Sequence, residues 1–162
     1  MRVAGIVRDS VVDGTGVRDV IFVQGCPHKC LGCHNPDTWN AEGGEYMAIN
    51  DIAKAIADSS NNVTISGGEP MKQFIHVRRL VNYLRSFQGK TAWLYTGYRF
   101  EDYMWEVWAD LCKAGVTVVV DGRFEQDKTD SNLRVRGSSN QRIIDLVQTM
   151  KRGEIVLWDD EE

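Results

Sequence analysis

The sequence predicts an α/β fold in the form of a partial, open (β/α) barrel with a parallel sheet. Stretches typical of strands alternate with amphipathic helical stretches, the order that gives parallel strands joined by right-handed crossovers. Residues 116–120 (Val-Thr-Val-Val-Val) predict a strand that is apolar on both faces, as in a parallel sheet covered by helices. A closed eight-fold barrel takes about 250 residues, so this chain of 162 residues is too short for one.

The individual elements follow from hydrophobic periodicity and from residues that end helices. Apolar residues at helical spacing define one face of each helix, as Val77, Leu80, Val81 and Leu84 do. Asn50 is a candidate cap for a helix, and Gly115 ends another. The predicted strands are residues 19–23, 63–65, 92–95, 116–120 and 155–157, and the predicted helices lie at residues 49–58, 77–84, 100–113 and 143–150.

Length and composition predict a single domain, residues 1–162. Hydrophobic residues make up 43% and charged residues 26% of the chain, as in a soluble globular protein. The net charge of −4 is acidic, whereas a nucleic-acid binder carries an excess of basic residues. We find no signal peptide and no apolar run near the ~20 residues that span a bilayer. We therefore expect a cytoplasmic protein with no nucleic-acid or membrane partner, and a solvated acidic end at residues 159–162.

Unusual residues follow four successive predicted strands. In α/β folds the functional groups cluster beyond the carboxyl ends of the strands. If these strands are parallel, all four segments meet at one face of the sheet, and a site is expected there. The segments are residues 25–33, 66–70, 95–98 and 121–123.

The strongest chemical signal is a cluster of three cysteines, Cys26, Cys30 and Cys33, spaced C-x3-C-x2-C. Clustered cysteines in a reducing compartment favour metal binding over disulfides. Thiolates are soft ligands that suit iron–sulfur clusters and zinc. A four-iron cluster takes one cysteine per iron, so three cysteines leave one iron open to a substrate or cofactor.

A structural zinc ion is the alternative interpretation of this loop, with His28 or His34 as the fourth ligand. His34 adjoins Cys33, and neighbouring residues seldom reach one tetrahedral ion. His28 lies between two cysteines in a tight loop, and the second Cys-x-x-Cys pair of zinc ribbons is absent. These points favour the cluster. The fourth cysteine, Cys112, lies in a helical pattern and reads as a small buried hydrophobic residue.

The second strand runs into Gly67, Gly68, Glu69 and Pro70. Two glycines at a strand end allow positive φ and a close backbone approach to a ligand. Pro70 favours an extended Glu69, whose carboxylate can accept hydrogen bonds from an ammonium group. The alternative is a Gly-Gly turn with a solvated glutamate. Residues 13–16 lack the third glycine of a dinucleotide-binding motif, so we interpret them as a turn.

The cysteine motif followed by Gly-Gly-Glu-Pro resembles the radical S-adenosylmethionine superfamily. Several longer stretches resemble, within it, the anaerobic ribonucleoside-triphosphate reductase-activating proteins. His34 stands where members often carry Tyr or Phe, and Glu69 where they often carry Asp. The matching stretches are residues 25–35, Thr38-Trp39, 95–98, 120–124 and 136–141 (Arg-Gly-Ser-Ser-Asn-Gln).

The resemblance implies a partial barrel of the radical S-adenosylmethionine type and a [4Fe-4S] cluster held by Cys26, Cys30 and Cys33. The open iron would chelate S-adenosyl-L-methionine, and reductive cleavage would give a radical that abstracts hydrogen from a glycine. In this resemblance Ser66 to Glu69 hold the methionine end and residues 32–34 meet the adenine. The implied cofactor-binding residues are Gly32, Cys33, His34, Ser66, Gly67, Gly68, Glu69, Asp121 and Arg123.

The implied partner is the large catalytic subunit of the anaerobic reductase, whose glycyl-radical loop would enter the open barrel. A low-potential donor such as flavodoxin would supply the electron. Arg134, Arg136 and residues 138–140 are candidate docking residues, although 138–140 can also be the cap of a helix near Ile143. Two alternatives remain: an activase of another glycyl-radical enzyme, such as pyruvate formate-lyase, and a non-enzymatic iron–sulfur or zinc-binding module.

Overall fold

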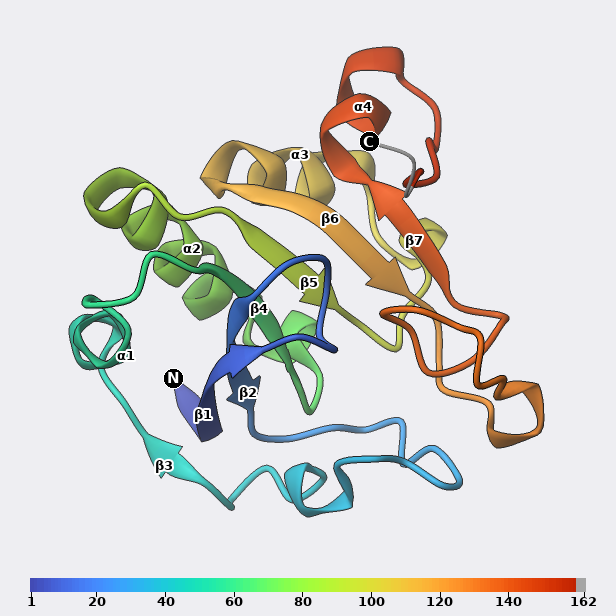
Figure 1. The fold of residues 1–162 in the computed structure, drawn as a ribbon, viewed down its shortest axis with the longest axis horizontal. Helices are drawn as coiled ribbons and strands as arrows, with labels where there is room; N and C mark the ends of the chain where they lie inside the picture. The colour runs from blue at the N-terminus through green and yellow to red at the C-terminus, as the bar shows by residue number, and fades with distance from the viewer. Residues whose placement is uncertain (160–162) are drawn as a thin grey trace.

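The computed structural model describes residues 1–159 and contains a seven-stranded sheet in the order β3-β1-β2-β4-β5-β6-β7 (Figure 1). Of the acidic end, residues 160–162 lie outside the described residues. The strands are β1 (Arg2–Ser10), β2 (Arg18–Val23), β3 (Glu45–Tyr46), β4 (Asn62–Gly67), β5 (Ala92–Tyr95), β6 (Val116–Asp121) and β7 (Arg142–Asp145). The helices are α1 (Ile49–Ala55), α2 (Phe74–Gln88), α3 (Trp105–Ala114) and α4 (Leu146–Arg152).

The sheet is mixed, with a parallel centre and antiparallel strands on both sides. Strands β2, β4, β5 and β6 pair in parallel. Strand β1 pairs antiparallel with β2 and β3, and β7 pairs antiparallel with β6. The prediction of a parallel sheet is therefore right for the centre and wrong for the edges. The sheet is not closed, which agrees with an open rather than a complete barrel.

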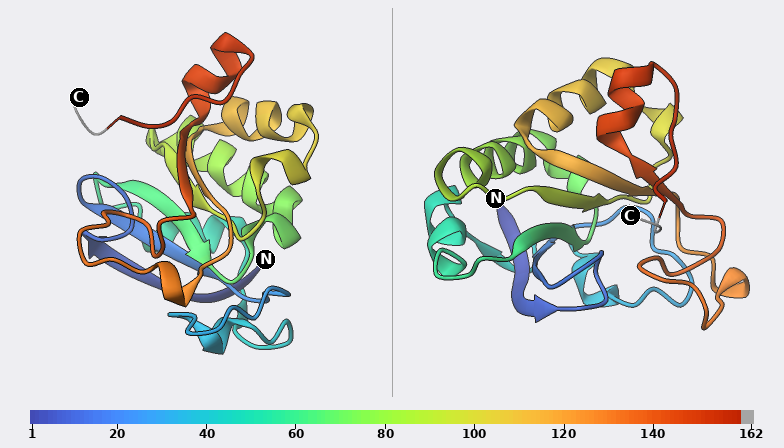
Figure 2. Two further views of the ribbon diagram at one scale, coloured as in Figure 1. Left: turned by 90° about the vertical axis from the view of Figure 1, so that its right-hand side faces the viewer. Right: turned by 45° about the horizontal axis from the view of Figure 1, so that its top comes forward.

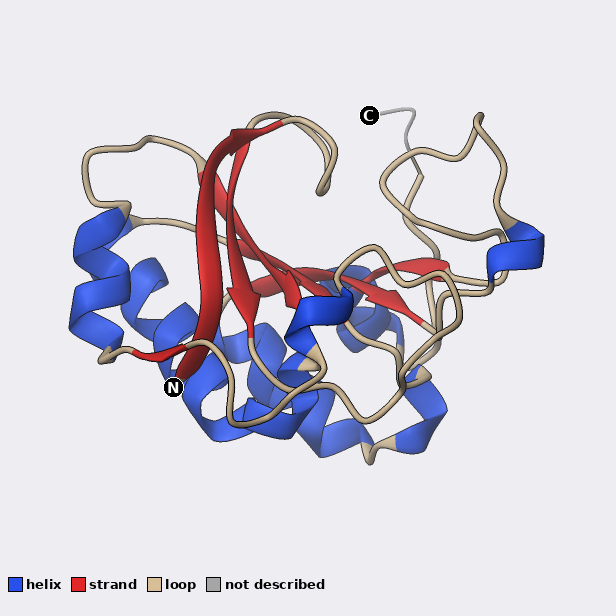
Figure 3. Cartoon of the chain, turned by 90° about the horizontal axis from the view of Figure 1, so that it is seen from below, coloured by secondary structure: helices blue, strands red, loops and turns tan. Residues whose placement is uncertain are grey.

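Helices α1 to α4 cover one face of the sheet (Figure 3). The main core lies between them and the strands, with Ile21, Ile65, Leu94 and Val119 facing the helices at 0% exposure. The other face carries a smaller cluster around Trp93, Val118 and Val120. Figure 2 shows the loops 11–17 and 122–141 on that side. The helices thus bury one face, and the second face remains available for a site.

The central prediction is confirmed, because β2, β4, β5 and β6 and helix α2 fall where the sequence places them. Two predicted helices differ from the structure. The predicted helix 100–113 divides into a 3-10 turn, Phe100–Asp102, and α3. Helix α1 begins at Ile49 as predicted but ends at Ala55 rather than residue 58, and its N-cap position is Ala48, so Asn50 is not its cap. Gly115 ends α3 with φ of 126° as expected.

The predictions fail at the two ends of the chain. Strand β1 was not anticipated, because register shifts after Val3 and Val7 break its alternation. Residues 142–145 form β7 rather than the first turn of a helix, and α4 begins at Leu146, where the Asp145 carboxylate accepts a hydrogen bond from the amide of Gln148 at 2.8 Å. Residues 138–140 therefore do not cap this helix. The predicted strand 155–157 is reduced to one bridge, between Leu157 and Ile144.

A search of residues 1–159 for a membrane-crossing helix is negative, since no helix there combines the necessary length and apolarity.

Candidate functional site

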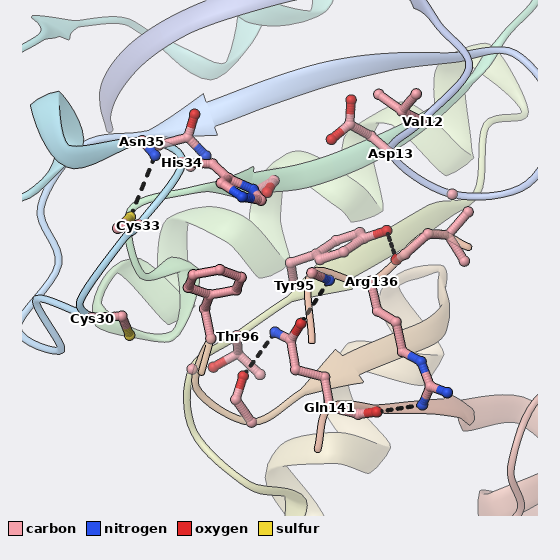
Figure 4. Close-up of a pocket in the computed structure, with 18 of the residues that line it drawn as sticks. Val12, Asp13, Cys30, Cys33, His34, Asn35, Tyr95, Thr96, Arg136 and Gln141 are labelled. Carbon is pink, nitrogen blue, oxygen red and sulfur yellow. Dashed lines mark hydrogen bonds between the residues drawn. The ribbon is translucent and has the colours of Figure 1, made fainter. Parts of the chain in front are cut away.

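The carboxyl ends of the four parallel strands meet at one cavity of about 980 Å³ (Figure 4). This confirms that the four unusual segments converge. The cysteine loop after β2, the glycines after β4, Thr96 and Gly97 after β5, and Gly122 after β6 all contribute to its wall. The turn 11–16 and residues 133–137 complete it.

The cysteine loop is anchored to the segment that follows it. The amide of Gly25 donates to the carbonyl of Thr38 at 2.7 Å, and the amide of Cys26 donates to that of Trp39 at 3.2 Å. The amide of Cys33 donates to the carbonyl of Cys30 at 3.1 Å. These bonds hold a tight loop in which all three cysteines are free thiols that line the cavity.

The three thiols are a donor set that fits an iron–sulfur cluster, because thiolates are soft ligands and each cysteine can bind its own iron. Within residues 1–159, no three His, Cys, Asp or Glu side chains lie close enough together to hold one ion. Backbone amides also donate to the sulfurs, as the amide of Asn35 does to Cys33 Sγ at 3.3 Å. Burial raises the pKa of the Cys26 thiol.

The backbone at the end of β2 leaves no room for a side chain at Gly67 or Gly68. A Cβ at Gly67, where φ is +98°, would lie 2.7 Å from the amide nitrogen of Val23, and one at Gly68 would lie 2.4 Å from the carbonyl oxygen of Gly25. The backbone is closely approached here, as expected, but the approaching groups are the backbone of Val23 and Gly25 rather than a ligand. With Ser66, both glycines line the cavity and present backbone polar groups to it.

Glu69 follows directly but faces inward, and it is not part of the cavity wall. Its side chain is fully buried, and its carboxylate accepts four hydrogen bonds. Oε1 accepts from the amide of Met71 at 2.9 Å and from Thr96 Oγ1 at 2.8 Å. Oε2 accepts from His28 Nε2 at 2.7 Å and from the amide of Gly97 at 2.8 Å. The solvated glutamate of the alternative interpretation is thus excluded.

The opposite wall is formed by loop 122–141, which carries the Arg-Gly-Ser-Ser-Asn-Gln stretch. The amide of Gln141 is its centre: Oε1 accepts from the amides of Gly137 and Ser138, and Nε2 donates to the carbonyl of Gly122 at 3.0 Å. Arg136 donates to the carbonyl of Gln141 at 2.6 Å. Figure 4 shows Arg136 and Gln141 across the cavity from Cys30 and Cys33.

Tyr95 joins this loop to the sheet, since its hydroxyl donates to the carbonyl of Val135 at 2.5 Å. Burial and the nearby carboxylate of Asp13 raise the pKa of Tyr95 far above its usual range. The phenol is therefore a neutral hydrogen-bond donor inside the cavity.

Four other residues predicted from the sequence occupy different environments. His34 lines the cavity and is exposed, with its ring 4.9 Å from that of Phe124. Gly32 lies beside Gln126, outside the wall. Asp121 is buried and bonded to the amide of Phe100 and to Arg142, and Arg123 is exposed. Neither Asp121 nor Arg123 lines the cavity.

The segment of residues 11–16 belongs to the site, although the sequence predicts only a turn at residues 13–16. The turn is present, and the segment lies over the cavity, with Asp13 and Val12 facing Tyr95 and Arg136 in Figure 4. The position of this turn over the cavity follows from the hairpin that β1 and β2 form. It could be predicted only if β1 were recognised in the sequence.

Comparisons with known proteins define first the class and then the closer family. A family described as a 4Fe-4S single cluster domain matches residues 12–144, which include the three clustered cysteines and most of the cavity wall. The chain thus has the sequence of an iron–sulfur cluster domain.

Curated relatives are more specific. The chain is 37% identical over 139 residues to the anaerobic ribonucleoside-triphosphate reductase-activating protein of Enterobacteria phage T4, covering 82% of this chain and 86% of the relative. It is 35% identical over 144 residues to the protein of that name from Escherichia coli K12 (81% and 90% covered) and 36% identical over 142 residues to that from Vibrio cholerae (82% and 90%). The chain belongs to the family of anaerobic ribonucleoside-triphosphate reductase-activating proteins.

Proposed function

We propose that this chain activates the large catalytic subunit of an anaerobic ribonucleoside-triphosphate reductase as a radical S-adenosylmethionine enzyme. With a [4Fe-4S] cluster bound, one electron from a low-potential donor such as flavodoxin would break the bond between the sulfur and C5′ of S-adenosylmethionine. The cleavage would supply a radical that takes a hydrogen atom from a glycine of the large subunit. A glycyl radical would remain there, and methionine and 5′-deoxyadenosine would be released.

The observation that carries the proposal is the meeting of three free thiols and a glycine-lined strand end in one cavity. Cys26, Cys30 and Cys33 would hold the cluster and leave one iron open. The adjoining backbone of residues 66–68 faces the same space and is suited to bind the amino group of the methionine moiety.

The other residues of the wall would orient the cofactor and shield it. The exposed ring of His34, next to Phe124, gives an aromatic surface for an adenine. Glu69 lies behind the strand end with its carboxylate already bonded, so its contribution to ligand binding would be to fix the backbone of Gly67 and Gly68. Asp121 and Arg123 lie off the wall, and we assign them no contact with the ligand.

The decisive experiment is electron paramagnetic resonance of the large subunit after anaerobic incubation with the reconstituted chain, S-adenosylmethionine and a reductant. We expect a glycine-centred doublet that requires all three. Cys30→Ala removes a cluster ligand and abolishes the signal together with iron binding. Cys112→Ala is the matched control, because Cys112 packs against the core away from the cavity, and it retains both. A colourless wild-type protein holding one zinc ion would refute the proposal.

A further inference from the structure

His28 occupies the middle of the cysteine loop, between Cys26 and Cys30, but its side chain is only 4% exposed. Its Nε2 donates to Glu69 Oε2 at 2.7 Å. A hydrogen bond to a carboxylate is stronger than one between neutral groups, and burial strengthens it further. This bond therefore joins the cysteine loop to the end of β4.

Glu69 is a rigid anchor for this contact. Besides His28, its carboxylate accepts from Met71, Thr96 and Gly97, so it is tied to the turn after β4 and to the end of β5. All four bonds are 2.9 Å or shorter. The imidazole thus binds an acceptor that cannot move without disrupting two strand ends.

The imidazole ring also fits sterically between its neighbours. A Cβ at Gly97 would lie 2.4 Å from Cδ2 and 2.7 Å from Nε2 of His28, so only glycine leaves room for the ring. The ring of Tyr98 packs against it edge-on, with centroids 4.6 Å apart and an interplanar angle of 72°. Hydrogen bonding and packing therefore specify one position for this side chain.

The cysteine loop needs a contact that holds it in place, because its backbone is strained at Lys29, the residue after His28. Lys29 has φ of 48°, a conformation that is unfavourable for a non-glycine residue and persists only where the surroundings impose it. Backbone hydrogen bonds hold the loop at Gly25 and Cys26 and again where Cys33 binds Cys30. The His28 side chain connects the residues between these points to the sheet.

We propose that His28 is a positioning residue that fixes the cysteine loop in its cluster-binding conformation before iron binds. Glu69 accepts the hydrogen bond that holds the imidazole, and Gly97 leaves the space that the ring occupies. The significance of this arrangement for cluster assembly rests on the proposed function. The contacts that hold His28 involve only residues of this chain. His28 is therefore not a ligand of zinc or of the cluster.

The test is hydrogen–deuterium exchange of the metal-free, reduced full chain, followed over residues 26–30. His28→Leu removes the donor and should raise exchange there roughly 10- to 100-fold, as expected for the loss of a hydrogen bond to a buried carboxylate. His28→Gln keeps a donor and should restore protection to within about threefold. Exchange in α2 should not change in either variant. His76→Leu, a histidine on α2 outside the cavity wall, should match the wild type.

Gly97→Ala provides a second route to the same contact. Its Cβ would displace the ring while leaving His28 and Glu69 in the sequence, so it should increase exchange at 26–30 like His28→Leu. This variant decides the matter if His28→Leu does not fold. Gly5→Ala, with nothing within 4 Å of the added atom, is its control. Both disruptive variants should take up iron and sulfide at least about tenfold more slowly than the wild type.

Unchanged exchange at 26–30 in His28→Leu and Gly97→Ala would overturn the proposal, whatever their activity. An equal increase in α2 would overturn it as well, because His28 would then support the fold in general. If the wild type gave no glycyl radical but the loop opened as expected, the proposed function would fail and the positioning role would stand.

Discussion

Gly67 shows how one residue at the site is determined by the backbone beside it. Its φ of +98° is unfavourable for any side chain, and an added Cβ would also enter the space of Phe22 and Val23. Strands β2 and β4 pair in register up to Val23 and Gly67. The cavity wall therefore depends on a position where β2 and β4 meet closely.

We expect Gly67→Ala to lower the free energy of unfolding by about 3 kcal/mol or more, because strain and a clash with backbone add up. Urea denaturation of the metal-free chain measures this. Gly5→Ala, which adds the same atom in open space, should change it by less than about 1 kcal/mol. Equal effects of the two substitutions would mean that β4 can move away from β2 at no cost.

Strand β7 is joined to the sheet by an ion-pair network at its first residue. Arg142 binds Asp121 at the end of β6 and also binds both carboxylate oxygens of Glu101, at 2.9 and 2.7 Å. Asp121 in turn accepts from the amide of Phe100 at 2.7 Å. Asp121 thus connects β6, β7 and the turn before α3, which accounts for its distance from the ligand cavity.

This network predicts an acid-dependent loss of stability. Hydrogen bonds from Arg142 lower the pKa of Glu101 to about 2, from 4.5. A carboxyl group with a lowered folded-state pKa stabilises the fold above pH 4.5, and its contribution disappears as the pH falls towards 2. Because half of the Glu101 side chain is exposed, we expect only about 1 kcal/mol.

Thermal unfolding of the metal-free wild type and of Glu101→Gln, compared from pH 7 to pH 2, checks this. The wild type should be more stable at pH 7, and the difference should vanish near pH 2. A difference that does not depend on pH would show that the charge of Glu101 contributes nothing.

How far each element could be predicted depends on whether its signal is local. The helical repeat of Val77 to Leu84 and the apolar run of β6 are local patterns, and both were predicted correctly. Residues 142–150 contain a strand followed directly by a helix, and Ile143, Ile144, Leu146 and Val147 fit either period. Only the pairing of β7 with β6 resolves the ambiguity.

The same distinction applies to the site. That the cysteines and glycines line one cavity could be predicted, because the carboxyl ends of parallel strands meet at one edge of a sheet. The inward direction of Glu69 was not predictable, since it depends on His28, Thr96 and Gly97, which are distant in the sequence from one another or from Glu69. Contacts that cross between loops leave no periodic pattern.

The whole sheet determines which segments surround the cavity. The sheet does not close, and the turn 11–16 and loop 122–141 both contribute to the cavity wall. Two exposed apolar side chains line the cavity, Val11 at 69% and Val12 at 72% exposure, and Leu31, 81% exposed, lines a smaller hollow with Phe124. Apolar rims of this kind mark interaction surfaces. On the proposed function, we expect the glycine loop of the reductase to enter from this side, past Arg134 and Arg136.

Limited trypsin digestion can locate that entry, because loop 122–141 has exposed cleavage sites at Arg123, Lys128 and Arg134. If the large subunit inserts its glycyl-radical loop here, saturating amounts should slow cleavage at these sites at least about tenfold. Arg152, exposed at the end of α4, is the internal control and should be cut at its original rate. Gel filtration under the same anaerobic conditions must show that the complex has formed. Unchanged cleavage at Arg134 within a formed complex would place the docking surface elsewhere on the molecule, and slower cleavage at Arg152 alone would place it on the helical side.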